Sequence, residues 1–144
     1  MATSYDAIHD RAIAKISDYD ILKFDNETRQ QILDEYLLSS QIEFQRLCKT
    51  DLSDKDDVLR QYNSDLGDEI VEILATGEVY YWLMPKVLNT ENLYNVLNTK
   101  DFSMYSPANL LKELQSLRDT FWNEFKRKMY LYTYRTASIS ELKA

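Results

Sequence analysis

Residues that turn the chain are scarce in this sequence, which holds two glycines and two prolines among 144 residues. A β-sandwich or β-barrel needs a turn signal about every 8–12 residues, so this composition favours helices. A chain of this length is expected to bury about two-thirds of its unfolded surface in one domain. The sequence therefore predicts an all-α, single-domain helical bundle of about five or six helices.

The last third of the chain carries the clearest helical pattern. Ser106 can accept hydrogen bonds from the first free amides of a helix, and Pro107 has no amide to leave unpaired. Apolar side chains then recur at steps of three and four and form one stripe, made of Leu110, Leu114, Leu117, Phe121, Phe125, Met129 and Tyr132. We expect a long helix of about 25 residues, a helical domain over residues 1–132, and an extended C-terminal tail or docking arm over residues 133–144.

Apolar periodicity and capping residues indicate further helices earlier in the chain, over about residues 4–16, 26–48, 53–62, 65–88 and 90–97. Residues 17–26 are interpreted as a packed connector that turns Ile21, Leu22 and Phe24 inward. Gly77 lies within the central helix, where glycine costs about 1 kcal/mol relative to alanine, so a second helix is expected to approach it closely. Pro85 predicts a kink or an end near Met84.

Side chains suited to catalysis or metal binding are poorly placed. His9, the single histidine, is expected at the surface, and Cys48, the single cysteine, as a small apolar residue. The carboxylates of Asp34, Glu35, Asp68, Glu69 and Glu72 are expected on solvated helix faces. The acids between residues 51 and 57 lack the glycine and distal glutamate of a calcium loop, and are expected to favour a helix N-terminus. We therefore expect no enzyme activity, no cofactor and no metal.

The distribution of charge is uneven. From Pro107 onward seven Lys and Arg face four acids, which gives +3 and leaves −10 of the total of −7 for residues 1–106. Sequence-independent affinity for nucleic acid comes from phosphates neutralised by Lys and Arg, so this charge disfavours a dedicated DNA binder. The first residues lack the pattern of a signal peptide and no apolar run approaches ~18 residues, which predicts no membrane partner and synthesis in a reducing cytoplasm.

The basic and aromatic C-terminal region is the candidate contact surface. Basic residues interleaved with aromatic residues can hold nucleic acid by charge and stacking, or hold an acidic protein surface. Self-association against the acidic part of the chain is a further alternative. The predicted partner-binding residues are Trp122, Lys126, Arg127, Lys128, Tyr130, Tyr132, Tyr134, Arg135, Ile139 and Leu142.

Two runs, residues 69–86 (EIVEILATGEVYYWLMPK) and residues 105–114 (YSPANLLKEL), together with the tyrosine-rich basic end, resemble the head-to-tail connector (neck or adaptor) proteins of tailed bacteriophages. The resemblance covers about residues 60–140; the first helices match only in length and helical character.

The resemblance implies a structural virion protein, made in the host cytoplasm and placed in the virion neck. It implies a homo-oligomeric ring, usually a dodecamer, beneath the portal protein, with the next neck or tail-completion protein on its other side. Double-stranded DNA would pass through the ring without specific binding, and the segment 130–144 would dock on the portal. Acids on the channel wall would let DNA slide. The alternative is a cytosolic helical scaffold or regulator that binds one protein partner through the same C-terminal surface.

Overall fold

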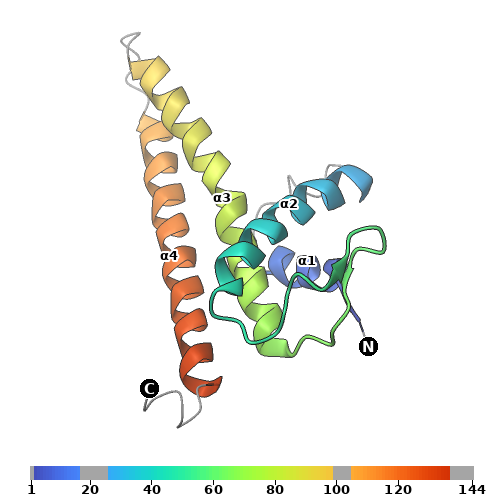
Figure 1. Cartoon of the computed structure of the whole chain (residues 1–144). Coiled ribbons are helices and arrows are strands. Elements are labelled where there is room, and N and C mark those ends of the chain that lie inside the picture. The colour runs from blue at the N-terminus through green and yellow to red at the C-terminus, as the bar shows by residue number, and fades with distance from the viewer. Residues whose placement is uncertain (1, 17–25, 99–104, 137–144) are drawn as a thin grey trace.

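The computed structural model describes residues 2–16, 26–98 and 105–136. Four helices fill most of this part of the chain, namely α1 (Tyr5–Ile13), α2 (Asn26–Gln45), α3 (Asp68–Asn98) and α4 (Tyr105–Thr136). Helices α3 and α4 lie side by side as a long antiparallel pair, and α1 and α2 pack against the N-terminal half of α3 (Figure 1). The expected helical fold is confirmed at this level, whereas the described residues form four helices instead of five or six.

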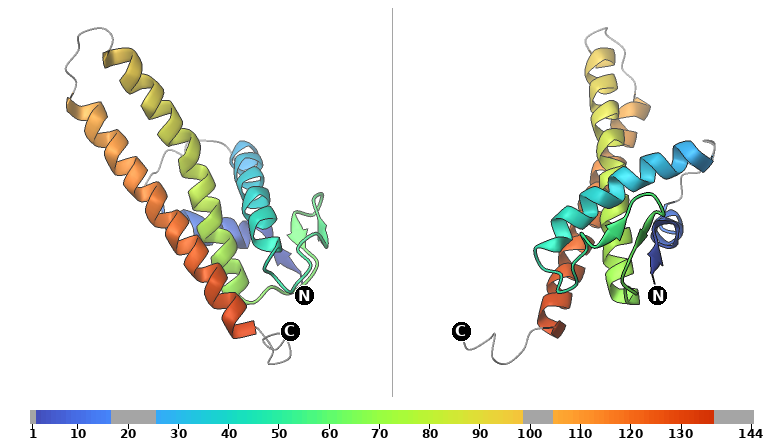
Figure 2. Two further views of the ribbon diagram at one scale, coloured as in Figure 1. Left: turned by 60° about the vertical axis from the view of Figure 1, so that its left-hand side comes forward. Right: turned by 45° about the vertical axis from the view of Figure 1, so that its right-hand side comes forward.

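A small antiparallel sheet joins these helices. Its strands β1 (Thr3–Ser4), β2 (Lys55–Asp56) and β3 (Gln61–Tyr62) follow the order β1-β3-β2, with β3 in the centre. Tyr62 pairs with both Thr3 and Lys55. Strands β2 and β3 form a hairpin that stands apart from α4 in two views (Figure 1; Figure 2, left).

The helix predicted over residues 53–62 is wrong, because side chains there bind backbone amides that a helix would need. The Asp51 carboxylate accepts a hydrogen bond from the Ser53 amide at 3.0 Å, and the Asp56 carboxylate accepts from the Val58 amide at 2.9 Å. Such local bonds give the backbone an alternative to the helix. These acids therefore shape a loop and a hairpin instead of a helix N-terminus.

The N-terminal helices follow their sequence signals. Ser4 caps α1 as predicted, since its hydroxyl accepts a hydrogen bond from the Asp6 amide at 3.1 Å. Ile8 and Ala12 are fully buried on one side of α1. In α2 the buried positions recur at helical spacing, and the helix packs against α3; they are Leu33, Leu37, Ser40, Gln41 and Phe44. The proposed inward positions of Ile21, Leu22 and Phe24 lie outside the described residues.

Helix α3 continues through Pro85, where a kink or an end was expected. The proline removes one helical hydrogen bond and costs about 3 kcal/mol in an isolated helix. Helix α4 packs lengthwise against α3 (Figure 1), and packing of this kind can offset the cost of a proline within a helix. The short helix predicted over residues 90–97 is therefore the end of α3. Helix α4 likewise extends beyond Tyr132 to Thr136, so the proposed tail begins inside it.

Gly77 marks the point where three helices meet. A Cβ atom at this position would lie 2.2 Å from Ser40 Oγ of α2 and 2.7 Å from Phe125 Cζ of α4. Both distances are too short for real atoms, so glycine is the residue that fits here. The Ser40 hydroxyl also donates a hydrogen bond to the Leu74 carbonyl at 2.9 Å. The predicted close approach of a second helix to Gly77 is confirmed, and a third helix joins it.

Candidate interaction surface

The inner face of α4 is part of the core. Phe125, Met129 and Tyr132 are at most 4% exposed, and the Tyr132 ring packs edge-on against Phe44, with centroids 5.1 Å apart. The Lys49 amide donates a hydrogen bond to the Tyr132 hydroxyl at 2.9 Å. Tyr132 therefore anchors α4 inside the domain, and in the single chain it is buried, not presented at the surface where partner binding was predicted.

Two cations of the predicted surface are bound within the chain. Lys128 Nζ lies 3.0 Å from the Glu72 carboxylate, and Arg135 pairs with Glu69. Both acids belong to α3, so these ion pairs join the outer edge of α4 to its neighbour.

Glu72 is the centre of a larger charge cluster, because Arg11 of α1 and Lys15, two residues beyond the end of α1, also pair with it. Burial favours a higher pKa for this carboxyl, but the hydrogen bonds and charges of Lys15 and Lys128 outweigh burial and lower the pKa to about 2. The expectation that Glu69 and Glu72 belong to a solvated face is wrong. They fasten α1 and α4 to α3.

Trp122 and Lys126 belong to an aromatic cluster between α3 and α4. The Trp122 ring lies 4.9 Å from the Tyr80 ring and 6.1 Å from the Phe125 ring, measured between centroids. Lys126 Nζ is 5.6 Å from the centre of the Trp122 ring, within the range of a cation–π contact. These two residues line the helix pair and are only partly available to a partner.

The remaining predicted residues lie on the side of α4 opposite the core. Tyr130 is 57% exposed and Tyr134 78% exposed, and Arg127 pairs with Glu124 of its own helix at 2.8 Å. Leu131, which the sequence reading did not select, is 51% exposed. We call these four residues, Arg127, Tyr130, Leu131 and Tyr134, the outer face of α4. Ile139 and Leu142 lie outside the described residues.

A polar cluster that the sequence reading missed joins α1, α2, α3 and the hairpin. His9 is 3% exposed, against the expected surface position, and Glu78 is fully buried. His9 Nε2 lies 2.7 Å from Asp34 Oδ1, and His9 Nδ1 lies 2.5 Å from Glu78 Oε1. Among the described residues neither Glu78 oxygen nor His9 Nδ1 has a partner with hydrogen-bond geometry, so the short His9–Glu78 contact is an ion pair.

Arg60 extends this cluster to the hairpin. Its guanidinium donates to Asp34 at 2.8 Å through two nitrogens and to Asp6 at 2.9 Å. Its backbone has a φ of 54°, an uncommon value for a residue with a side chain. Its carbonyl accepts a hydrogen bond from the Tyr5 amide at 2.9 Å. Asp34 is therefore bound on both sides and does not lie on a solvated face.

The pKa values of this cluster follow from burial and pairing. Burial lowers the pKa of His9, but its pairing with Asp34 and Glu78 outweighs burial and raises the pKa to about 9. Burial raises the pKa of Glu78 to about 7, against the opposing effect of His9. The Asp34 carboxyl is desolvated as well, yet Arg60 and His9 hold its pKa at about 2. The cluster therefore keeps a proton on His9 at neutral pH.

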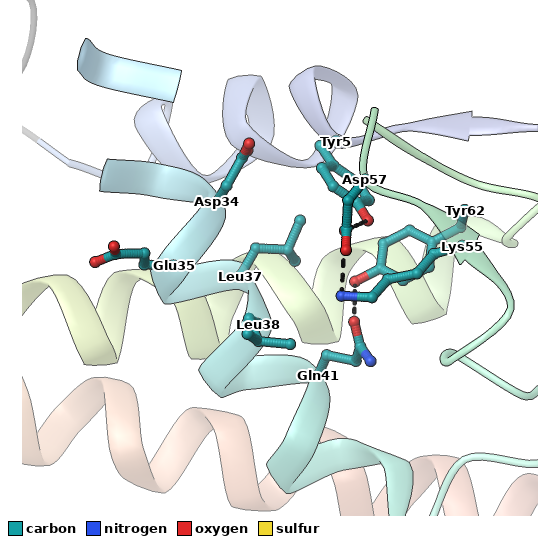
Figure 3. Close-up of a pocket in the computed structure, with 9 residues that line it drawn as sticks. All are labelled: Tyr5, Asp34, Glu35, Leu37, Leu38, Gln41, Lys55, Asp57 and Tyr62. Carbon is teal, nitrogen blue, oxygen red and sulfur yellow. Dashed lines mark hydrogen bonds and ion pairs between the residues drawn. The ribbon is translucent and has the colours of Figure 1, made fainter. Parts of the chain in front are cut away.

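A cavity of about 250 Å³ lies beside this cluster, between α2 and the hairpin (Figure 3). Its polar side chains bind one another: the Tyr5 hydroxyl donates to Asp57 at 2.8 Å, and the Tyr62 hydroxyl donates to Gln41 at 2.9 Å. Lys55 pairs with Asp57 at 3.4 Å. This arrangement leaves neither a nucleophile with an adjacent base nor a group of metal ligands within the part of the chain that the structure describes.

Cys48 is half-buried, and burial raises the pKa of its thiol, which keeps it protonated. The Tyr132 hydroxyl lies 3.8 Å from Cys48 Sγ.

None of the helices in the described ranges is long and apolar enough to cross a membrane. Comparison of the chain with protein-family models, with curated proteins and with solved structures finds no match.

Proposed function

We propose that this protein is a structural component of a bacteriophage virion, a head-to-tail connector that forms a ring beneath the portal protein. The observation that carries the proposal is the outer face of α4. This face exposes two tyrosines, a leucine and an arginine, whereas the opposite side of the same helix packs into the core. Tyrosine and arginine are enriched where proteins meet. The resemblance of residues 69–86 and 105–114 to connector proteins gives this surface its assembly role.

In this proposal the outer face of α4 contacts a second copy of the chain. Residues 137–144, which include Ile139 and Leu142, dock on the portal, and the opposite side of the ring receives the next neck or tail-completion protein. Double-stranded DNA passes through the centre without specific binding, in keeping with the −10 charge of residues 1–106.

The test is to mix the purified chain with a candidate portal ring and to image the product by electron microscopy. An added layer with ring symmetry is expected. A chain that fails to associate with the portal, and instead forms a one-to-one complex with a cytosolic protein, would overturn the proposal in favour of a helical scaffold or regulator.

A truncation after Thr136 sharpens this test. It removes the proposed docking segment but keeps all of α4, including the pairing of Arg135 with Glu69. The thermal unfolding midpoint should stay unchanged while the layer on the portal is lost. A truncated chain that still binds the portal would show that the docking segment lies elsewhere.

A further inference from the structure

The tip of the β2–β3 hairpin exposes two adjacent aliphatic side chains. Val58 is 90% exposed and Leu59 is 66% exposed. Single apolar side chains at a surface are common, whereas contiguous ones often mark contact sites. We call Val58 and Leu59 the hairpin tip.

The hairpin tip is held in place by polar side chains on both sides. The Asp56 carboxylate accepts hydrogen bonds from the Val58 and Leu59 amides at 2.9 and 3.0 Å. Arg60, directly after the tip, is fixed to Asp6 of α1 and to Asp34 of α2. Because the loop is already ordered, contact with a partner requires little further loss of conformational entropy.

A copy of this chain cannot cover its own outer face with its own hairpin. Helix α4 and the hairpin lie on opposite sides of the molecule, with α3 between them (Figure 1; Figure 2, left). The buried stripe of Phe125 and Met129 faces inward, so the outer face of α4 points away from the hairpin. Two different apolar surfaces on opposite sides allow each copy to contact two others in a head-to-tail manner.

Charge favours the same pairing. Residues 51–59 contain four acids and one lysine, whereas residues 126–136 contain four cations and no acid. Three of those cations pair with acids of their own chain, Lys128 and Arg135 with α3 and Arg127 with Glu124. The excess positive charge of this surface is therefore small, and the acidic hairpin carries most of the charge difference. Potentials of opposite sign steer two surfaces together and fix their orientation.

We infer that the hairpin tip of one copy packs on the outer face of α4 of a second copy, with Val58 and Leu59 against Tyr130, Leu131 and Tyr134. The inference rests on the proposed ring assembly and names the part of the neighbouring subunit that the outer face receives. Two such small surfaces bury less than the ~1,200 Å² typical of a stable interface. Each pairwise contact is therefore weak, and closure of the ring supplies the avidity.

Directed cross-linking tests a weak contact of this kind. In a Cys48→Ala background, one copy carries Leu59→Cys and a second, mass-tagged copy carries Tyr134→Cys. The two are mixed under mild oxidation. A disulfide requires Cα atoms about 4.4–6.8 Å apart. The mixed dimer therefore forms only if the hairpin tip lies against the outer face of α4, and the inference predicts that it forms. It should be lost when the first copy also carries Val58→Ser.

The matched control replaces Tyr134→Cys with Ile42→Cys, since Ile42 of α2 is 59% exposed and lies outside both surfaces. Mixed dimers that form no faster with Tyr134→Cys than with Ile42→Cys overturn the inference. That result leaves the proposed function standing if the unmodified chain still adds a layer to the portal ring. If the cross-link forms but the unmodified chain adds no layer to the portal ring, the proposed assembly on the portal is overturned instead.

Discussion

Helix α4 and the β2–β3 hairpin are fastened to the same domain by different forces. The inner face of α4 is held by uncharged apolar and aromatic side chains around Phe125, and the ion pair of Lys128 with Glu72 of α3 stays charged at neutral pH because the pKa of Glu72 is about 2. The hairpin is held by Arg60, which pairs with Asp34. Asp34 also contacts the buried His9, and His9 contacts the buried Glu78. Apolar burial is insensitive to pH, whereas buried ionisable groups couple stability to proton binding. The two regions should therefore respond differently to mutation and to pH.

Removal of the Phe125 ring should have the largest effect. The side chain is fully buried between α3 and α4 and touches the position of Gly77. Phe125→Ala is expected to lower the free energy of unfolding by about 3–5 kcal/mol, measured by urea denaturation, and by the same amount at pH 6 and pH 8.5.

Leu117→Ala, at a position of α4 that is 44% exposed, serves as the control and should cost much less. A loss for Phe125→Ala that depends strongly on pH would mean that the two regions are not held independently.

A rise in pH should weaken the hairpin region. The pKa of His9 is about 9 in the fold against about 6.5 unfolded, so its contribution is complete below pH 6.5 and is lost as the pH rises through 9. The pKa of Glu78 is raised to about 7, so its contribution is lost in the same direction, between about pH 4.5 and 7. The free energy of unfolding is expected to fall by the order of 2 kcal/mol between pH 6 and pH 9.

Glu78→Gln tests the origin of that fall. The substitution keeps the size of the side chain but removes its titration and its charge beside His9, so the slope of stability against pH should decrease. Denaturant melts at several pH values measure the slope in both proteins. Measurements stop at pH 9 because the tyrosines, whose pKa values are raised by burial, affect stability only above about pH 10, and a Cys48→Ala background removes the thiol, which titrates at about pH 8.5 in an unfolded chain. An unchanged slope would assign the pH dependence to other groups.

A methyl group at Gly77 should have a smaller effect. Gly77→Ala forces Ser40 and Phe125 to move, at a cost of about 1–3 kcal/mol for an overpacked core. The better helix propensity of alanine returns about 1 kcal/mol. A net loss of about 1 kcal/mol is expected in thermal or urea melts, and a gain in stability would show that the three helices can separate without cost.

The two regions also differ in how far the sequence predicts them. Periodic apolar positions identify α3 and the inner face of α4, because one helix face must meet another. Partners of His9 lie 25 residues away at Asp34 and further still at Glu78, and no local pattern links them. A local hint that His9 is buried is its position next to Ile8, which belongs to the buried stripe of α1. The acidic and aliphatic residues between 51 and 62 resemble the start of a helix. The side-chain hydrogen bonds of Asp51 and Asp56 to backbone amides favour a hairpin instead, and the sequence pattern does not show them.

Substitution on the outer face of α4 should have the smallest effect on stability. Tyr134→Ser removes a side chain that is 78% exposed, so the free energy of unfolding should change by no more than about 0.5 kcal/mol. Tyr132→Ser, two residues earlier in the same helix, removes a buried ring and the acceptor of the Lys49 amide and should cost several times more. If the outer face serves assembly, Tyr134→Ser keeps the melting behaviour of the natural chain and loses ring formation on the portal, as seen by electron microscopy. A stability loss for Tyr134→Ser equal to that of Tyr132→Ser would place Tyr134 in the fold and remove the basis for an assembly surface there.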